Sequence, residues 1–255
     1  MSTFICTVPV APLRASASHP SEMVSQLLFG ETCRSLGTVT DGWLRVKCDF
    51  DDYEGFCQTS QIMSVGEDFT KKNTSLASGW SNHLEWEGLA MHVPFGSALT
   101  GMSNGSSAWA GQKLKYLGSS WDIETHRNAV DKVKGLALQY LNTPYLWGGR
   151  SVYGVDCSGL TQIVYRFIDI KLPRDAWQQA EKGEKISSLA SSQIGDLAFF
   201  DNDAGKVVHV GILFNTKTII HAAGKVRIDK IDEEGILQGE SGFRSHRLCG
   251  IRRLV

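Results

Sequence analysis

Apolar and polar residues alternate in the N-terminal quarter of the chain, in short runs separated by turn residues. In the run at 43–48, Leu44, Val46 and Cys48 fall on one strand face and the residues between them fall on the other. A half-buried strand has this period of two. The pattern predicts a small all-β module over residues 1–65. Shorter runs of the same kind occur at 13–16, 33–40 and 55–58.

A polar stretch at 66–75 separates this module from a second set of short apolar runs. Runs at 93–101 and 112–118 have the length of strands, and the NGSS sequence at 104–107 is typical of a turn. Residues 66–122 are therefore predicted to form a second, smaller β module.

After residue 123 the spacing of apolar residues lengthens to three and four. Over 130–141 it predicts an amphipathic helix that ends at Asn142-Thr143-Pro144. A second helix is predicted over 157–168, with one narrow buried face. Strands follow, and helices first with strands afterwards indicate an α+β domain over 123–255. The predicted strands lie at 196–200, 207–214, 218–224 and the C-terminus.

The composition narrows the classes of function. The 255 residues hold 26 Lys and Arg against 27 Asp and Glu, a net charge of −1, with no basic block. A nucleic-acid partner is not expected, because such binding depends on neutralising many phosphates. The apolar runs fall far short of the roughly 18 residues that span a bilayer, so no membrane segment is expected.

The N-terminal sequence predicts a cytoplasmic protein. No basic segment opens it, and Pro9 and Pro12 interrupt its apolar stretch, which does not fit a signal peptide. The six cysteines form no C-x-x-C pair, and a reducing compartment keeps them as thiols. A cysteine in such a setting is ordinarily a small buried hydrophobic residue. Only Cys157 has a sequence context that indicates another role.

Cys157 stands immediately ahead of the second predicted helix. The free N–H groups and the positive end of the helix dipole at that place stabilise an anion. A cysteine there, beside a histidine, can have its pKa lowered from about 8.5 to between about 3.5 and 7.5. The position predicts a thiol biased toward thiolate.

Two histidines can supply a base for this thiol. His209 and His221 are 12 residues apart, with Asn215 midway between them. If their strands form a hairpin, the two side chains lie directly opposite on one face, with Cβ atoms roughly 4.5 to 5.5 Å apart. One imidazole can then hydrogen-bond the other, as base and orienting group do in a nucleophilic triad.

The spacing alone leaves alternatives open. It does not say which histidine faces the sulfur, although the chain order of nucleophile, base and orienting residue would make His209 the base. The two histidines can also be a structural pair, or join Cys157 as zinc ligands, for which no fourth ligand is evident. The remaining histidines are interpreted as ordinary polar residues: His19, His83, His92, His126 and His246.

Five motifs occur in order in the C-terminal half: DCSGL at 156–160, LPRDAWQQ at 172–179, GDLAFF at 195–200, HVGIL at 209–213 and IIHAAG at 219–224. Through them, residues 123–255 resemble the NlpC-type papain-like cell-wall peptidases. The resemblance implies helices packed on an antiparallel sheet, with Cys157 as nucleophile, His209 as base and His221 as the orienting residue. It also implies cleavage of γ-D-glutamyl to diamino-acid bonds in peptidoglycan stem peptides, with no metal or organic cofactor.

The N-terminal half resembles bacterial SH3-like modules through LLFGE, DGWLRV at 41–46 and YEGFC at 53–57. Residues 1–65 are expected to be one such domain, and 66–122 a degenerate second one. SH3-like modules ahead of this peptidase domain look like the subgroup that recycles murein peptides inside the cell. Its members require a free N-terminal L-Ala and release L-Ala-D-Glu.

The resemblance to this subgroup implies residues that bind the substrate. Asp156 is the candidate carboxylate for the free amine, since a buried partner for an ammonium group discriminates strongly against a blocked amine. Ser158 matches a neighbouring polar contact. Glu22 and Tyr53 in the first module are expected to close the amino-terminal end of the pocket, by a looser analogy.

Two further residues have open roles. Tyr145 corresponds by the PYLWGG motif to a tyrosine whose hydroxyl can join the Cys157 N–H in an oxyanion hole, or it is a packed aromatic residue beside Trp147. Arg174 pairs a substrate carboxylate or caps local structure.

Other classes of function remain possible on the sequence alone. A binding-only protein can present SH3-like modules beside an inactive peptidase fold, although it would not need Cys157, His209 and His221 together. A papain-like acyltransferase can share the same scaffold. The sequence leaves open whether the diamino acid is meso-diaminopimelate or lysine, and leaves open the oligomeric state.

Overall fold

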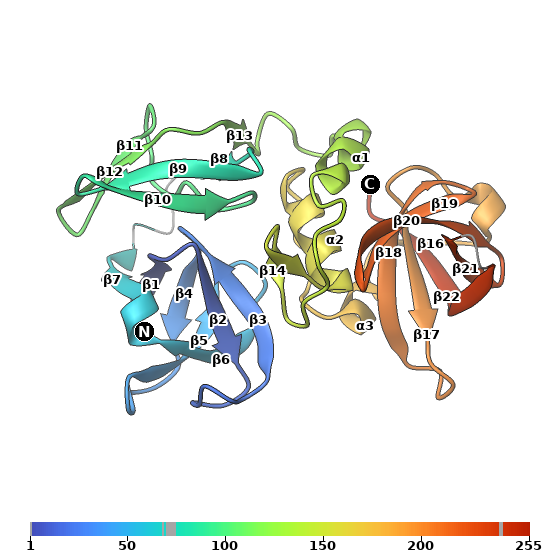
Figure 1. Ribbon diagram of the computed structural model, residues 1–255, viewed down its shortest axis with the longest axis horizontal. Coiled ribbons are helices and arrows are strands. Elements are labelled where there is room, and N and C mark those ends of the chain that lie inside the picture. Colours follow the sequence, from blue (N-terminus) through green and yellow to red (C-terminus); the bar gives the residue numbers. More distant parts are fainter. Residues whose placement is uncertain (1, 68, 70–74, 240–241) are drawn as a thin grey trace. The chain divides into compact units, whose positions relative to one another are not determined.

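The computed structural model describes residues 2–67, 69, 75–239 and 242–255 and divides the chain into two compact units (Figure 1). The first unit comprises Met1–Thr125 together with Trp147–Tyr153. The second comprises His126–Leu146 and Gly154–Val255. Within the described residues, no helix has the length and hydropathy of a membrane span. Much of the predicted polar linker, residues 68 and 70–74, lies outside the described residues.

The first unit begins with a seven-stranded antiparallel sheet in the order β3-β2-β6-β5-β4-β1-β7. Leu44, Val46 and Cys48 on β5 face its core, which confirms the predicted alternation. The strands are β1 (Thr3–Cys6), β2 (Val10–Arg14), β3 (Met23–Leu28), β4 (Thr32–Ser35), β5 (Trp43–Cys48), β6 (Glu54–Gln58) and β7 (Ile62–Val65), with a 3-10 turn at Thr59–Gln61.

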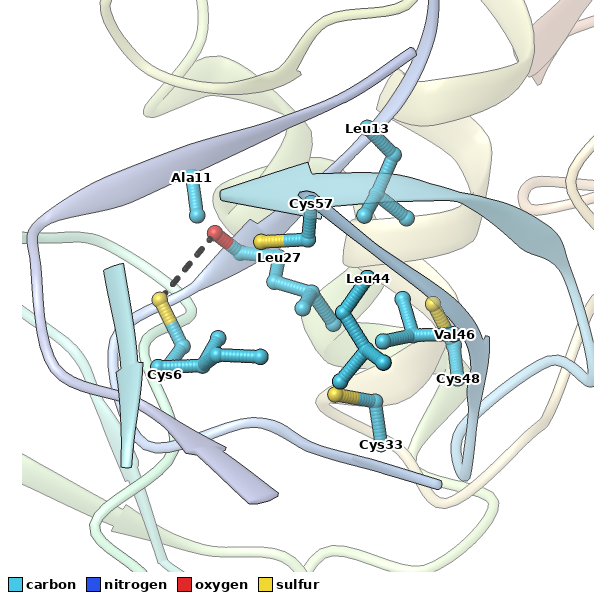
Figure 2. Packing of buried hydrophobic residues seen from close by; sticks show 10 residues of the cluster. Cys6, Ala11, Leu13, Leu27, Cys33, Leu44, Val46, Cys48 and Cys57 are labelled. Atoms are coloured by element: carbon cyan, nitrogen blue, oxygen red, sulfur yellow. Dashed lines mark hydrogen bonds between the residues drawn. The ribbon is translucent and has the colours of Figure 1, made fainter. Parts of the chain in front are cut away.

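Four thiols lie in that core. Cys6, Cys33, Cys48 and Cys57 pack with leucine, valine and alanine side chains, and the Cys6 Sγ lies 3.6 Å from the backbone oxygen of Leu27 (Figure 2). These four thiols are free and buried. They fill the space that other small apolar side chains would fill.

The second β region of this unit is a four-stranded sheet in the order β10-β9-β12-β11 with a separate pair, β13 and β8. Its core includes Trp109, which stacks on Phe29 of the first region with ring centroids 4.9 Å apart. The two β regions therefore share a core. The strands are β8 (Ser75–Ala77), β9 (Ser81–Trp86), β10 (Leu89–Pro94), β11 (Ser106–Trp109), β12 (Gln112–Tyr116) and β13 (Ser120–Asp122).

Residues 147–153 belong to the first unit, although the sequence assigned them to the peptidase domain. The guanidinium of Arg150, on β14 (Arg150–Ser151), is buried and donates to both carboxylate oxygens of Glu31, at 2.8 and 3.1 Å. It also donates to the backbone oxygen of Gln26 at 2.6 Å. A buried charge needs such partners, and the first unit supplies them, so this segment groups with it.

The second unit contains the helices α1 (Val130–Leu138), α2 (Cys157–Arg166) and α3 (Ala176–Gln179) and a 3-10 turn at Leu189–Ser191. Helix α1 ends before its predicted C-terminus, because the backbone turns at Asn142 with a positive φ of 67° and its N–H bonds to Val226. The prediction of one narrow buried face on the second helix was wrong, since every residue of α2 is buried.

The strands of the second unit form a sheet in the order β16-β22-β17-β18-β19-β20-β21. Because β21 also pairs with β22, six of these strands close into a barrel and β16 stays at its edge (Figure 1). The α+β class is confirmed. The strands are β15 (Gly154–Val155), β16 (Glu184–Ile186), β17 (Leu197–Asp201), β18 (Val207–Asn215), β19 (Thr218–Ala223), β20 (Lys225–Asp232), β21 (Gly235–Gln238) and β22 (Phe243–Arg253).

Candidate active site

Cys157 is the first residue of α2, and the helix packs against β18. The Asp156 side chain caps the helix, since its Oδ1 accepts the Gly159 N–H at 2.7 Å. The backbone N–H groups of Ser158 and Val210 hydrogen-bond the Cys157 Sγ. Val210 immediately follows His209 on β18, so the thiol lies beside the strand that carries the candidate base.

The expected low pKa of Cys157 was wrong for the free protein. Burial raises the pKa of the thiol to about 12, and the Asp156 carboxylate adds to the rise. The two backbone N–H groups and Arg174 oppose the rise but do not overcome it. The sequence argument counted the helix terminus and left out the cost of burying a thiolate.

His209 and His221 lie on β18 and β19 and share a hydrogen bond of 2.9 Å between His209 Nε2 and His221 Nδ1. The predicted pairing of these histidines on one sheet face is therefore present. They are not directly opposite, however, because His221 pairs with Gly211. Direct opposition would require a hairpin centred on Asn215, but the turn is at residues 216–217 and the register shifts between Leu213 and Asn215. The side chain of Asn215 accepts the Lys217 N–H in this turn.

Gly211 makes the diagonal contact between the histidines possible. A Cβ at this position would lie 2.9 Å from the Cβ of His221 and 2.7 Å from Cδ1 of Ile219. Both distances are shorter than real side-chain contacts, so only glycine fits here without displacing His221.

His209 is neutral in this setting. Burial lowers its pKa well below the ordinary value, and the neighbouring His221 and His246 lower it further. A neutral imidazole on the strand that lies beside a neutral thiol is suited to take the thiol proton when an electrophile arrives.

Three residues that the sequence analysis missed extend this site. His221 Nε2 lies 3.0 Å from Oδ2 of Asp229 on β20, and Arg227 Nη2 donates to Oδ1 of Asp229 at 2.9 Å. His246 on β22, which was interpreted as an ordinary polar residue, stacks on His209 with ring centroids 4.1 Å apart. The signal for β20 was present, because a hairpin centred on Gly224 pairs His221 with Arg227 and puts Asp229 on the same face. No local pattern marks His246.

The three histidines can be tested as a metal centre. One ring nitrogen of each lies within 4.8 Å of the others. His209 and His246 are stacked at an interplanar angle of only 23°, so their in-plane lone pairs do not converge on one point. His209 and His221 already share a hydrogen bond. The arrangement fits a hydrogen-bonded relay better than tetrahedral zinc ligation.

Tyr145 lies near the thiol. It is half-buried, and burial raises the pKa of its hydroxyl to about 12, with added contributions from the Cys157 and Asp156 charges. The hydroxyl is therefore a neutral donor at working pH, as an oxyanion hole requires. Its role in that hole stays a prediction.

Asp156, Ser158 and Arg174 form a buried network. The Arg174 guanidinium donates to both oxygens of Asp156, at 3.0 and 2.5 Å, and to Ser158 Oγ at 2.9 Å. Of the two roles considered for Arg174, the structure favours the structural one, because its charge neutralises Asp156 inside the fold. Amine binding by Asp156 and Ser158 stays a prediction.

Glu22 and Tyr53 lie in the first unit. The exposed Glu22 accepts a hydrogen bond of 2.6 Å from Nε1 of Trp147, a residue of the same unit. Tyr53 is half-buried immediately before β6, where its N–H donates to Oδ1 of Asp51. Their expected role at the pocket stays a prediction.

Two family profiles match the sequence. The profile of the NlpC/P60 family matches residues 142–244, and that of the bacterial dipeptidyl-peptidase SH3 domain matches residues 13–62. The probable endopeptidase NlpC of Escherichia coli K12 is 41% identical over 108 residues, 42% of this chain and 70% of the relative. The chain belongs to the NlpC/P60 family. The resemblance that the five motifs carry is confirmed, and with it the predicted cysteine peptidase domain and an SH3-like domain ahead of it.

Other NlpC/P60 relatives match more of the chain. The γ-D-glutamyl-L-lysine dipeptidyl-peptidase of Bacillus cereus is 32% identical over 151 residues, 57% of this chain and 44% of that protein. Dipeptidyl-peptidase 6 of Lysinibacillus sphaericus is 26% identical over 257 residues, 88% of this chain and 90% of that protein. The chain thus spans less than half the length of the first of these relatives.

A solved structure confirms the NlpC/P60 fold. The crystal structure of an NlpC/P60 family protein from Bacillus cereus superposes with a TM-score of 0.83, covers 99% of both chains and is 20% identical. At this identity the likeness concerns the fold.

Proposed function

We propose that this protein is a cysteine peptidase that hydrolyses the γ-D-glutamyl to L-diamino acid bond of peptidoglycan stem peptides. The observation that carries the proposal is the hydrogen-bonded histidine pair on β18 and β19 beside a thiol at the start of α2. The relatives named γ-D-glutamyl-L-lysine dipeptidyl-peptidase and dipeptidyl-peptidase 6 support the choice of bond.

The proposed reaction runs in two steps. In the first, the thiol proton of Cys157 passes to His209 as Sγ bonds to the γ-carbonyl carbon of D-Glu. The oxyanion rests on the Cys157 N–H with the neutral Tyr145 hydroxyl as a second donor. His209 then gives its proton to the leaving amine as the C–N bond breaks.

The second step restores the thiol. His209 takes a proton from water as the water oxygen attacks the thioester carbon. The C–S bond breaks, the γ-carboxylic acid of D-Glu leaves and loses its proton to solvent, and the proton on His209 returns to the sulfur of Cys157. His221 orients His209 throughout, and water is the only co-reactant of the two steps.

We further propose that the substrate has a free N-terminal L-Ala and that the released product is L-Ala-D-Glu, as in the recycling of murein peptides in the cytoplasm. The name of dipeptidyl-peptidase 6, whose match covers most of both chains, supports release of a dipeptide. Asp156 and Ser158, next to the nucleophile, and Glu22 and Tyr53 are the candidate partners of the amine.

The test is to incubate the protein with L-Ala-γ-D-Glu-L-Lys, with the meso-diaminopimelate analogue, and with the N-acetylated form of each. Mass spectrometry follows the products, and Cys157→Ala is the control. Release of L-Ala-D-Glu from the free peptides alone is expected. Equal cleavage of the acetylated peptides would contradict amine recognition. No cleavage of any peptide would favour a binding protein or an acyltransferase.

A further inference from the structure

The hydrogen-bonded chain behind the candidate base ends at Asp229, whose carboxylate is 5% exposed. Burial by itself would raise the pKa of this carboxyl. Hydrogen bonds from His221 and Arg227 and from the Gly239 N–H overcome burial and hold its pKa well below the usual range. Asp229 is therefore an anion at neutral pH and can only accept hydrogen bonds.

Each oxygen of Asp229 has its own partners. Oδ1 accepts the Arg227 Nη2 hydrogen bond at 2.9 Å and the Gly239 N–H at 3.2 Å. Oδ2 lies 3.0 Å from His221 Nε2 and 2.5 Å from Arg227 Nε. Two hydrogen bonds thus hold Oδ1 in place, while Oδ2 faces both His221 and the Nε of Arg227.

We infer that Asp229 is a positioning residue that fixes the tautomer of both histidines and so makes Nδ1 of His209 the nitrogen that receives the thiol proton. Since Asp229 only accepts, Nε2 of His221 must carry the hydrogen, and Nδ1 of a neutral His221 must be bare. Nδ1 of His221 then accepts from His209, so Nε2 of His209 carries the hydrogen. The remaining ring nitrogen, Nδ1 of His209, keeps its lone pair.

Asp229 also faces the charge that forms during the reaction. When the thiol proton arrives, the positive charge lies on imidazoles whose hydrogen bonds lead to this carboxylate. The other titratable and charged groups around the pair are Arg227 on β20, His246 on β22 and Cys157 on α2. Arg227 and His246 do not stabilise a cation there, so Asp229 is the countercharge.

The inference rests on the proposed peptidase function and makes an unusual prediction about two substitutions. In Asp229→Asn, the amide oxygen keeps the two hydrogen bonds at the Oδ1 position, and the amide NH2 points at His221 and displaces the Nε of Arg227. His221 must then accept on Nε2 and donate from Nδ1, and His209 carries its hydrogen on Nδ1, where it can no longer take a proton. Asp229→Ala removes the preference for one tautomer of the two histidines without reversing it.

Asp229→Asn is therefore expected to lower kcat/KM by about 10² to 10⁴-fold, as reversal of an imidazole tautomer does in a serine protease triad. Asp229→Ala is expected to lower it by only about tenfold. A purely structural role predicts the opposite order, because Asn fills the space of Asp and Ala leaves a hole. Equal losses, or a larger loss in Asp229→Ala, would overturn the inference.

The matched control is Asp232→Asn. Asp232 also lies on β20 and also pairs with an arginine, Arg244, but it is half-exposed and has no contact with the histidines among its hydrogen bonds. The kcat/KM of Asp232→Asn is expected to stay within about twofold of the parent value.

The pH dependence of kcat/KM gives another readout. Its acid limb is expected to move to lower pH in Asp229→Ala, because losing the carboxylate destabilises the protonated histidine pair.

A second readout needs no activity. In the Cys157→Ala protein, ¹⁵N NMR of the imidazole rings is expected to show hydrogen on Nε2 of both His209 and His221, and hydrogen on Nδ1 of both once Asp229→Asn is added. An unchanged tautomer in Asp229→Asn would overturn the inference even if the protein hydrolyses the peptide. The expected reversal without hydrolysis of any peptide would retain the relay and reject the proposed function.

Discussion

Cys57 in the seven-stranded sheet of the first unit and Cys157 in the second unit are both buried free thiols, and burial raises the pKa of each to about 12. Cys57 packs among leucine, valine and other cysteine side chains (Figure 2). Cys157 begins a helix, accepts hydrogen bonds from backbone N–H groups and lies beside β18, which carries one histidine of the pair. Burial and thiol pKa do not distinguish a nucleophile from a packing residue here, whereas the polar neighbours do.

The comparison bears on how Cys157 reacts. Since the pKa of the thiol is raised and that of His209 is lowered, the free protein holds a neutral pair instead of a thiolate and an imidazolium. In the proposed reaction, proton transfer then has to accompany attack on the substrate. The proposed relay of His209, His221 and Asp229 would supply a base that the core thiols lack.

The largest difference in activity is expected between two variants that each lack one of these thiols, Cys157→Ala and Cys57→Ala. Cys157→Ala is expected to lower kcat for peptide hydrolysis by at least about 10⁴-fold, the scale seen when a covalent nucleophile is removed. Cys57→Ala should keep the parental kcat and lose about 1 kcal/mol of unfolding free energy, because it leaves a small cavity. Peptide kinetics and urea denaturation measure the two quantities.

Comparable residual activity in the two variants would abolish the distinction between these cysteines. A loss of activity in Cys157→Ala supports a catalytic role only if the variant keeps a melting temperature close to that of the parent. A melting curve is therefore measured for each variant.

Part of the site could be predicted because it depends on local patterns. Cys157 ahead of a helical spacing and His209 and His221 an even number of residues apart place a thiol and two imidazoles on defined elements. The exact register between the histidines was missed because it depends on a turn at 216–217 and on the absence of a side chain at Gly211. Neither appears in the period of the strands.

The rest depends on the closed barrel. His246 contacts His209 from β22, which pairs with β17, a strand far from it in sequence. Likewise, Arg150 groups with the first unit, and not with the domain assigned from the sequence, because its buried charge pairs with Glu31. Long-range partners of buried charges and rings have no periodic signature in the chain.

The second test removes the positive charge that neutralises Asp156 beside Cys157. Arg174→Met leaves the Asp156 carboxylate buried next to Cys157 without its arginine, and is expected to cost about 3 to 5 kcal/mol of unfolding free energy. The additional substitution Asp156→Asn should recover part of that loss. Chemical denaturation of the single and double variants measures it.

Arg247→Met is the control for this pair. Arg247 is exposed and pairs with Asp201 at the surface, so its loss should leave the denaturation midpoint unchanged. A double variant as unstable as Arg174→Met would mean that the arginine stem, and not its charge, supports the site.

A smaller effect is expected from filling the space beside His221. Gly211→Ala places a methyl group 2.9 Å from the His221 Cβ and should lower kcat by about 10 to 100-fold, with about 1 to 3 kcal/mol of lost stability. Gly250→Ala, on β22, meets open space and should change neither. Equal kcat values for the two variants would show that the diagonal contact of the histidines is not needed.

The mildest test changes only the pH. Because the thiolate is the species that iodoacetamide alkylates and the pKa of Cys157 is raised to about 12, its labelling rate should rise about tenfold per pH unit between pH 6 and 9. A Cys249→Ser background removes the thiol that is exposed among the described residues. The four core thiols of the first unit, Cys6, Cys33, Cys48 and Cys57, should label only after unfolding, since their side chains are buried. Peptide mass mapping reads each site, and a Cys157 rate that levels off below pH 8 would instead reveal a standing thiolate and imidazolium pair.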